Sequence, residues 1–130
     1  MTKLLTNDSE TLYIDKDLNS FNSDTLYRLY IKRNSEEILQ AFLPKEAFED
    51  VIESYTKIIS ENKNYDIGYF INAIGNCEIL LLKLSKDILP VVSITQELES
   101  EYIEFPIQYG FLEKLLELKD RKNELHKNCW

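Results

Sequence analysis

The sequence predicts an α+β domain in which a mostly antiparallel sheet of four to six strands packs against two helices. Three patterns carry this prediction: short segments that alternate between apolar and polar residues, two stretches with helical spacing, and turn-forming residues between them. The chain has 130 residues, of which 44% are hydrophobic and 12% aromatic. A chain of this length usually forms one domain, so we expect a single domain over residues 1–130.

Two segments near the N-terminus predict strands. Residues 11–15 are short and β-prone, and a loop rich in turn-forming residues follows at 16–24. Residues 26–33 alternate between apolar and polar side chains, which is the period of a half-buried strand. The apolar face of this segment consists of Tyr27, Leu29 and Ile31.

Residues 36–43 fit two structures. As a strand they would pair with residues 26–33 through a tight turn, and as a helix they would be capped by Ser35. We favour the strand. Pro44 ends the segment in either case, because the residue before a proline disfavours helical backbone.

Residues 45–61 predict the clearest helix, because their apolar side chains fall at helical spacing on one face. This face consists of Phe48, Val51, Ile52, Tyr55, Ile58 and Ile59. Four acidic residues lie elsewhere around the helix, most of them near its N-terminus, where the helix dipole favours negative charge. They are Glu46, Glu49, Asp50 and Glu53.

The centre of the chain predicts a second hairpin. Residues 65–73 alternate, and Gly75-Asn76 suits a tight turn into a buried strand at 77–84. A helix through residues 67–84 is the alternative. Two glycines and an asparagine inside that stretch disfavour it.

The C-terminal part predicts one more strand and a second helix. Residues 91–95 are rich in β-branched side chains. Pro106 suits the first turn of a final helix, which we expect over residues 106–126. The apolar side of this helix would consist of Ile107, Phe111, Leu112, Leu115, Leu116 and Leu118.

The negative charge of the chain is concentrated in its middle. Residues 34–104 hold 14 of the 23 acidic residues and 5 of the 15 basic ones, a net charge of −9 in a chain of net −8. In an extended segment Glu97, Glu99 and Glu101 would point the same way, and Glu104 follows them. Tyr102 and Phe105 lie in the same stretch and could anchor an interface. Together with the acidic residues of 45–61, they form the predicted partner-binding site.

No arrangement of residues predicts catalysis, a metal or a cofactor. Asp15-Lys-Asp17-Leu-Asn19 matches the opening of a calcium-binding loop, but Ser20 replaces the required glycine and Leu26 the closing glutamate. The single histidine, His126, lies in a polar C-terminal turn without a paired nucleophile. We therefore expect no enzyme, no cofactor and no metal site.

Two further observations concern location. The two cysteines, Cys77 and Cys129, are fewer than a disulfide-dependent secreted domain of this size carries, so we expect reduced thiols. The N-terminus lacks the apolar stretch of a signal peptide, and the longest aliphatic run, residues 79–82, is too short to span a membrane. We expect a cytoplasmic protein without membrane contact.

The negative charge, together with the lack of residues that predict catalysis, a metal or a cofactor, predicts a protein that acts by binding another protein. Arg28, Tyr30 and Lys32 share one face of a strand, as in some RNA-binding sheets, but the acidic chain opposes direct nucleic-acid binding. We expect an acidic, non-catalytic protein that neutralises a basic partner, in the class of bacterial immunity proteins and antitoxins that inhibit cationic, nuclease-type toxins. The alternatives are a phage-type nucleic-acid mimic that inhibits a DNA-binding protein and a small structural or oligomerisation subunit. A monomer and a homodimer are both compatible with the sequence.

Overall fold

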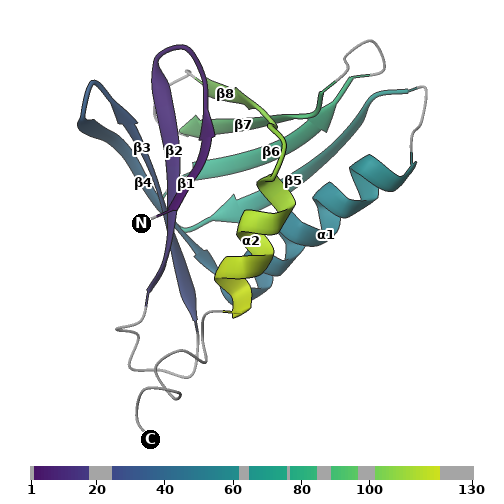
Figure 1. Ribbon diagram of the computed structural model, residues 1–130, viewed down its shortest axis with the longest axis horizontal. Coiled ribbons are helices and arrows are strands. Elements are labelled where there is room, and N and C mark those ends of the chain that lie inside the picture. Colours follow the sequence, from purple (N-terminus) through teal and green to yellow (C-terminus); the bar gives the residue numbers. More distant parts are fainter. Residues whose placement is uncertain are drawn as a thin grey trace, which may run out of the picture.

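The structure repeats one order of elements, four antiparallel strands followed by a helix (Figure 1). It is a computed structural model and describes residues 2–17, 25–61, 65–75, 77–84, 89–96 and 102–120. The first sheet contains β1 (Thr2–Thr6), β2 (Glu10–Asp17), β3 (Leu26–Arg33) and β4 (Glu36–Pro44), and α1 (Lys45–Glu61) follows it. The second contains β5 (Ile67–Ala73), β6 (Cys77–Lys83), β7 (Val91–Gln96) and β8 (Tyr102–Pro106), and α2 (Phe111–Asp120) follows it.

The predicted α+β class, the antiparallel pairing and the two helices are confirmed, and the strands are divided between two sheets of four. Both ambiguous segments are strands. Residues 36–43 lie within β4, and residues 67–84 contain the β5–β6 hairpin, which pairs from Ile67 and Lys83 to Ala73 and Cys77. The predicted boundaries of β3 and α1 agree with the structure.

The turn between β3 and β4 has two residues with left-handed backbone, Asn34 with φ of 52° and Ser35 with φ of 68°. Positive φ at both central positions is the type I′ geometry, whose twist matches that of paired strands. Asparagine adopts this backbone more readily than most residues, while serine does so at a cost. The hairpin therefore forms with one favourable and one strained turn residue.

Helix α1 begins directly after β4, because Pro44 ends the strand and Lys45 opens the helix. Its apolar side packs into the angle between the two sheets, with Phe48, Val51 and Ile58 buried. Helix α2 contacts α1 and β1 and closes the same angle (Figure 1). The edge-to-face contact between Tyr55 and Phe111, with ring centroids 5.0 Å apart, joins the two helices.

The two sheets meet where β4 passes β5. Phe42 and Ile74 exchange two backbone hydrogen bonds of 2.8 Å each at this junction. Gly75 follows with φ of +119°, and a Cβ atom there would lie 3.2 Å from the carbonyl oxygen of Gln40 and 3.3 Å from the Cα of Ala41. The junction therefore requires glycine for both its backbone conformation and its close approach.

A second junction joins the opposite sheet edges. The Asn7 side chain donates a hydrogen bond of 2.9 Å to the carbonyl oxygen of Glu104, which connects the β1–β2 turn to β8. The Gln108 side chain donates a bond of 3.3 Å to the carbonyl oxygen of Thr6. Both bonds hold the start of the first sheet against the end of the second.

The predicted final helix is wrong at its start. Pro106 ends β8 instead of opening the helix, and α2 begins at Phe111, after Gly110 with φ of +91°. Proline is tolerated in β8 because this strand lies at a sheet edge. Ile107 is buried but precedes the helix, where its amide donates to the carbonyl of Pro90 at 2.8 Å. Residues 121–126 lie outside the described part of the chain.

Strand β1 was not predicted, because its sequence lacks alternation. Leu4 and Leu5 are adjacent and both buried, although neighbouring residues of a regular strand point to opposite faces. The pairing of β1 with β2 shifts register between Lys3 and Leu5, which turns both leucines inward.

Side chains from both sheets and both helices form one hydrophobic cluster. A cavity of about 20 Å³ remains inside it, lined only by apolar side chains such as Ile14, Leu43, Phe48, Leu81 and Ile94. This is about the space of one water molecule, and apolar cavities of this kind stay dry. The cavity is packing space and offers no room for a substrate.

Candidate functional site

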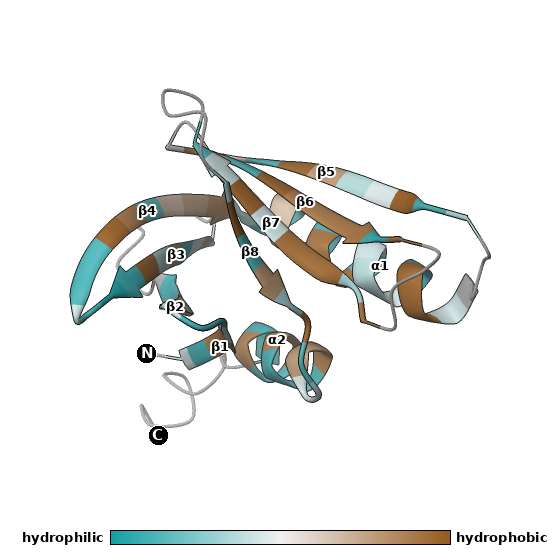
Figure 2. Ribbon diagram, turned by 90° about the horizontal axis from the view of Figure 1, so that it is seen from above, coloured by the Kyte–Doolittle hydropathy of each residue, from teal (hydrophilic) through white to brown (hydrophobic). Residues whose placement is uncertain are grey.

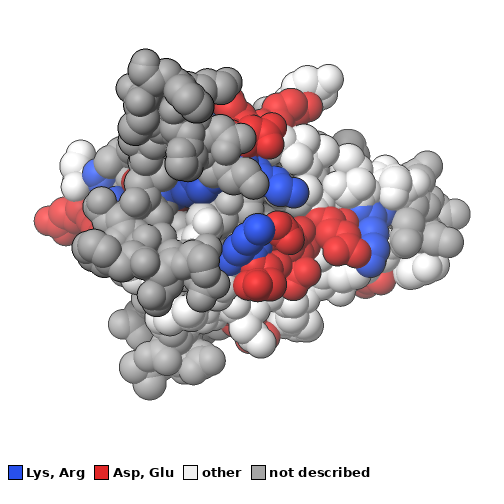
Figure 3. All heavy atoms as spheres, turned by 90° about the horizontal axis from the view of Figure 1, so that it is seen from below, with Lys and Arg blue, Asp and Glu red and all other residues white. Residues whose placement is uncertain are grey.

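The acidic residues of α1 lie on the helix side that faces away from the sheets. Glu46, Asp50 and Glu53 are exposed, and Glu49 is half-buried. Figure 3 shows a band of acidic side chains on this side of the molecule. Lys57 forms an ion pair of 3.2 Å with Glu53, one turn away. We call Glu46, Glu49, Asp50 and Glu53 the helix row.

The predicted residues of β8 divide between two environments. Tyr102 is 62% exposed, and Glu104 is also exposed. Phe105, in contrast, is 0% exposed because it belongs to the hydrophobic core. The interpretation of Phe105 as an interface anchor is therefore wrong, while Tyr102 faces solvent. Glu97, Glu99 and Glu101 lie outside the described residues.

The helix row and the exposed residues of β8 lie on opposite sides of the second sheet. Helix α1 packs against the inner face of β5 and β6, and its acidic row points still further from the sheet. Figure 2 views the sheet from its other side, with α1 behind the strands. The predicted residues in the described chain thus form two surfaces and not a single docking face.

The outer face of the second sheet is exposed along its two edge strands, β5 and β8, while Ser93 at its centre is 7% exposed. In the strand register, Phe70, Leu80, Ser93 and Glu104 form one row across the sheet, and Asn72, Glu78, Thr95 and Tyr102 form the next. We define the open face as the outward residues of β5–β8: Gly68, Phe70, Asn72, Glu78, Leu80, Leu82, Val91, Ser93, Thr95, Tyr102, Glu104 and Pro106.

The open face combines exposed aromatic rings with negative charge. Phe70 is 68% exposed and lies beside Leu80, so that an apolar strip begins at the β5 edge. The charged residues of the open face are the carboxylates Glu78 and Glu104, and it contains no lysine or arginine. Phe70 and Tyr102 lie on the two edge strands of the sheet, and each has one carboxylate near it, Glu78 on the strand beside Phe70 and Glu104 two residues after Tyr102.

The outer face of the first sheet has a different structure. The rings of Tyr13 and Tyr30 stack with centroids 5.2 Å apart, and the Arg28 guanidinium lies 4.5 Å above the Tyr30 ring. Lys32 Nζ lies 5.6 Å from the Tyr13 centroid and 5.9 Å from that of Tyr30. We call Tyr13, Asp15, Arg28, Tyr30 and Lys32 the closed face, because these side chains cover one another.

Asp15 is the central acceptor of the closed face. It accepts hydrogen bonds from Arg28 at 3.2 Å and from the Tyr30 hydroxyl at 3.3 Å. Burial raises the pKa of Asp15, but its hydrogen bonds, including these two, lower the pKa further, so the net shift is downward. Burial and the charge of Asp15 both raise the pKa of Tyr30. Within the closed face, the charge of Asp15 is therefore paired with that of Arg28.

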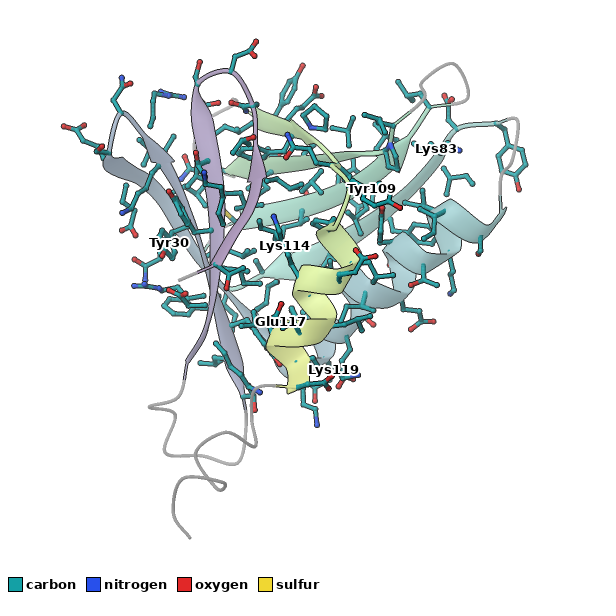
Figure 4. All side chains as sticks on the ribbon, viewed as in Figure 1. Tyr30, Lys83, Tyr109, Lys114, Glu117 and Lys119 are labelled. Atoms are coloured by element: carbon teal, nitrogen blue, oxygen red, sulfur yellow. The ribbon has the colours of Figure 1, made fainter. Side chains whose placement is uncertain are left out.

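The closed face does not offer a stacking platform for bases. Tyr30 lies on the outer side of β3, away from the helices (Figure 4), yet it is only 1% exposed because its neighbours cover it. The Arg28 side chain is engaged by Asp15, and Arg33 pairs with Glu10 at 2.7 Å. Arg28 and Arg33 thus have acidic partners within the first sheet, and Lys32 lies over the two tyrosine rings.

Within the described residues, no group of three His, Cys, Asp or Glu side chains lies close enough to hold a metal ion. In the calcium-loop motif, Asp15 is engaged by Arg28 and Tyr30, whereas Asn19 and Ser20 lie outside the described chain. Cys77 is buried in the core, as its apolar strand predicts. His126 and Cys129 also lie outside the described residues.

Sequence reasoning missed Phe70, the most exposed aromatic residue of the open face. The alternation in residues 65–73 places Tyr69 and Ile71 on the buried side, so Phe70 is an apolar residue in the polar phase of the pattern. That mismatch is the signal in the sequence for an exposed apolar contact. This signal can be interpreted only with the structure, which places both helices on the other face of the sheet and so leaves Phe70 exposed.

Neither helix in the described ranges has the length and apolar composition needed to cross a membrane. Comparison with family models, curated proteins and solved structures gives no match to this chain.

Proposed function

We propose that this protein is a cytoplasmic, non-catalytic binding protein that neutralises a basic protein partner. Within this class we propose a bacterial immunity protein or antitoxin that inhibits a cationic, nuclease-type toxin. The observation that carries the proposal is the open face, in which the exposed Phe70 and Tyr102 accompany Glu78 and Glu104 without a cation.

The physical argument concerns both affinity and rate. Exposed aromatic rings supply the buried contact area on which most interface energy depends. Carboxylates on the same face attract a cationic partner and speed its association. A nuclease-type toxin carries positive charge to hold nucleic acid, so an acidic protein can occupy the same cleft. The net charge of −8 extends this attraction beyond the contact itself.

A pull-down with the tagged full chain from its native organism, at low and moderate salt, identifies the captured proteins by mass spectrometry. One basic protein retained at both salt concentrations supports the proposal, provided that the purified chain also inhibits its activity. Many nucleic-acid binders that dissociate with salt would indicate a nucleic-acid mimic instead. Recovery of the bait alone would contradict the proposal and favour a self-assembling subunit.

Matched charge variants then locate the contact. Glu78→Gln with Glu104→Gln removes two charges from the open face, and Glu36→Gln with Glu37→Gln removes two from β4 in the first sheet. We expect the first pair to weaken binding of the captured protein at least about fivefold and the second to change it less than about twofold. Equal effects would mean that only net charge matters. Sensitivity to Glu46→Gln with Asp50→Asn instead would move the contact to the helix row.

A further inference from the structure

Strand β5 has an unpaired backbone edge. It is the first strand of the second sheet, and its described hydrogen bonds on the side away from β6 are the two between Ile74 and Phe42. In an antiparallel strand the N–H and C=O of one residue point to the same side, and successive residues alternate. The backbone groups of Gly68, Phe70 and Asn72 therefore point the same way as those of Ile74, toward the open edge.

The pairing with the first sheet stops for a physical reason. If the register of Phe42 and Ile74 continued, Pro44 would lie opposite Asn72. Proline has no N–H to donate, and the chain leaves the strand for α1 at Lys45. The junction thus pairs the backbone groups of one residue at the β5 edge and leaves the other backbone groups of this edge available for pairing.

The other three edge strands are protected against pairing, and β5 is not. Natural edge strands avoid unwanted pairing through charges, prolines and bulges. β1 carries Lys3 and a register shift, β4 carries Glu36, Glu37 and Pro44, and β8 carries Glu104 and Pro106. The sequence of β5, IGYFINA, contains no charge and no proline, and its register with β6 is continuous.

We infer that β5 accepts an extended segment of the basic partner, which adds a fifth strand to the second sheet. This inference rests on the proposed function and specifies how the partner is held. The added strand would lie beside Phe70, so its outward side chains would continue the open face (Figure 2).

Charge selects a basic segment over a second copy of this chain. Two copies would each bring a net charge of −8 to the contact. A cationic segment would instead be attracted by the same field and by Glu78, one strand away from Asn72 in the register. The backbone bonds would supply affinity, and the outward side chains beside Phe70 would supply selectivity.

Amide hydrogen exchange of the full chain tests the inference with a defined probe, a peptide of alternating lysine and valine. We expect the peptide to protect the amides of Gly68, Phe70 and Asn72. A control peptide of the same sequence, with an N-methyl group on every residue, keeps its charge but has no N–H to donate along either edge, and we expect no protection. Equal effects of both peptides, or no protection at these amides, would overturn strand addition. Equal binding of a neutral peptide of alternating threonine and valine would overturn the basic occupant.

Two variants at one position provide a second measurement. Asn72→Pro removes the outward N–H without touching the ladder to β6, whereas Asn72→Thr keeps it. We expect Asn72→Pro to weaken binding of the lysine–valine peptide about fivefold, and Asn72→Thr to change it less than about twofold. Equal affinities would contradict the inference. If Asn72→Pro does not fold, the peptide pair still decides.

These outcomes separate the inference from the proposed function. A captured basic protein that binds Asn72→Pro as well as wild type would leave the function standing and remove β5 as its site. Failure to capture any basic protein would overturn the function itself.

Discussion

The two sheets are built alike, with the same number of strands, the same meander and a helix after each, but their outer faces differ. On the closed face the aromatic and charged side chains contact one another, so that even the outward Tyr30 is buried. On the open face Phe70 and Tyr102 point to solvent, and the carboxylates have no cation beside them in the face. A face whose groups satisfy one another contributes to stability, whereas a face left open is available to a partner.

The largest expected effect distinguishes the stability of the closed face from that of the open face. Tyr30→Ala should destabilise the protein by about 3 kcal/mol. The change removes a buried ring, the stacking of that ring on Tyr13 and the hydrogen bond from the Tyr30 hydroxyl to Asp15. Phe70→Ala should change stability by less than about 0.5 kcal/mol, because that ring is exposed. Urea unfolding of both variants measures the difference. Similar losses would mean that the two faces are energetically alike.

The second test concerns the junction that fixes the two faces relative to each other. Gly75→Ala should cost about 2 kcal/mol, because the new methyl group meets the backbone of Gln40 and Ala41 at a positive φ. Gly110→Ala shares the positive φ, but nothing lies within 4 Å of its Cβ position, so we expect about 1 kcal/mol. Thermal unfolding of the pair separates crowding from backbone strain. Equal losses would show that the close approach costs nothing.

A third, smaller effect tests the interactions of Asp15 in the closed face. Because the pKa of Asp15 is lowered in the folded protein, its contribution is present above the usual value of 3.8 and is lost as pH falls through the folded pKa. Asp15→Asn should therefore lower the free energy of unfolding by about 1 kcal/mol at neutral pH. The difference between the variant and wild type should disappear at acidic pH. Glu104→Gln on the open face should change stability by less than about 0.5 kcal/mol. A difference in unfolding free energy between Asp15→Asn and wild type that does not depend on pH would contradict this account.

The smallest effect concerns the β3–β4 hairpin, whose turn lies at the end of the closed face. Ser35→Gly should stabilise the protein by about 0.5 kcal/mol, because glycine relieves the left-handed backbone at a small entropic cost. The same measurement on Asn34→Gly should show a smaller gain, because asparagine already tolerates this conformation. A loss of stability in Ser35→Gly would mean that the serine side chain contributes an interaction of its own.

Much of the fold could be predicted because some segments carry strong periodicity. The alternation of residues 26–33 and the helical spacing of 45–61 fix their structure locally, and both boundaries agree with the structure. The start of the last helix could not be predicted in this way. Pro106 fits a first helical turn and an edge strand equally well, and only the pairing of Val91 with Pro106 decides.

The candidate site could be predicted only in part. Composition identified acidic residues and Tyr102 as exposed groups, but no local pattern states which face of a sheet the helices cover. That decision, made by long-range packing, buried Phe105 and exposed Phe70. It also placed the helix row and the open face on opposite sides of the sheet.

The second junction has a consequence for the order in which the chain folds. Each strand pairs with its neighbour in sequence, so both meanders can form through short loop closures. The bonds from Asn7 to Glu104 and from Gln108 to Thr6 join residues that are 97 and 102 positions apart. Closing so long a loop costs the most chain entropy, so these contacts should form last. We therefore expect these contacts between the two ends of the described chain to complete folding. For the same reason they should be the first contacts to open.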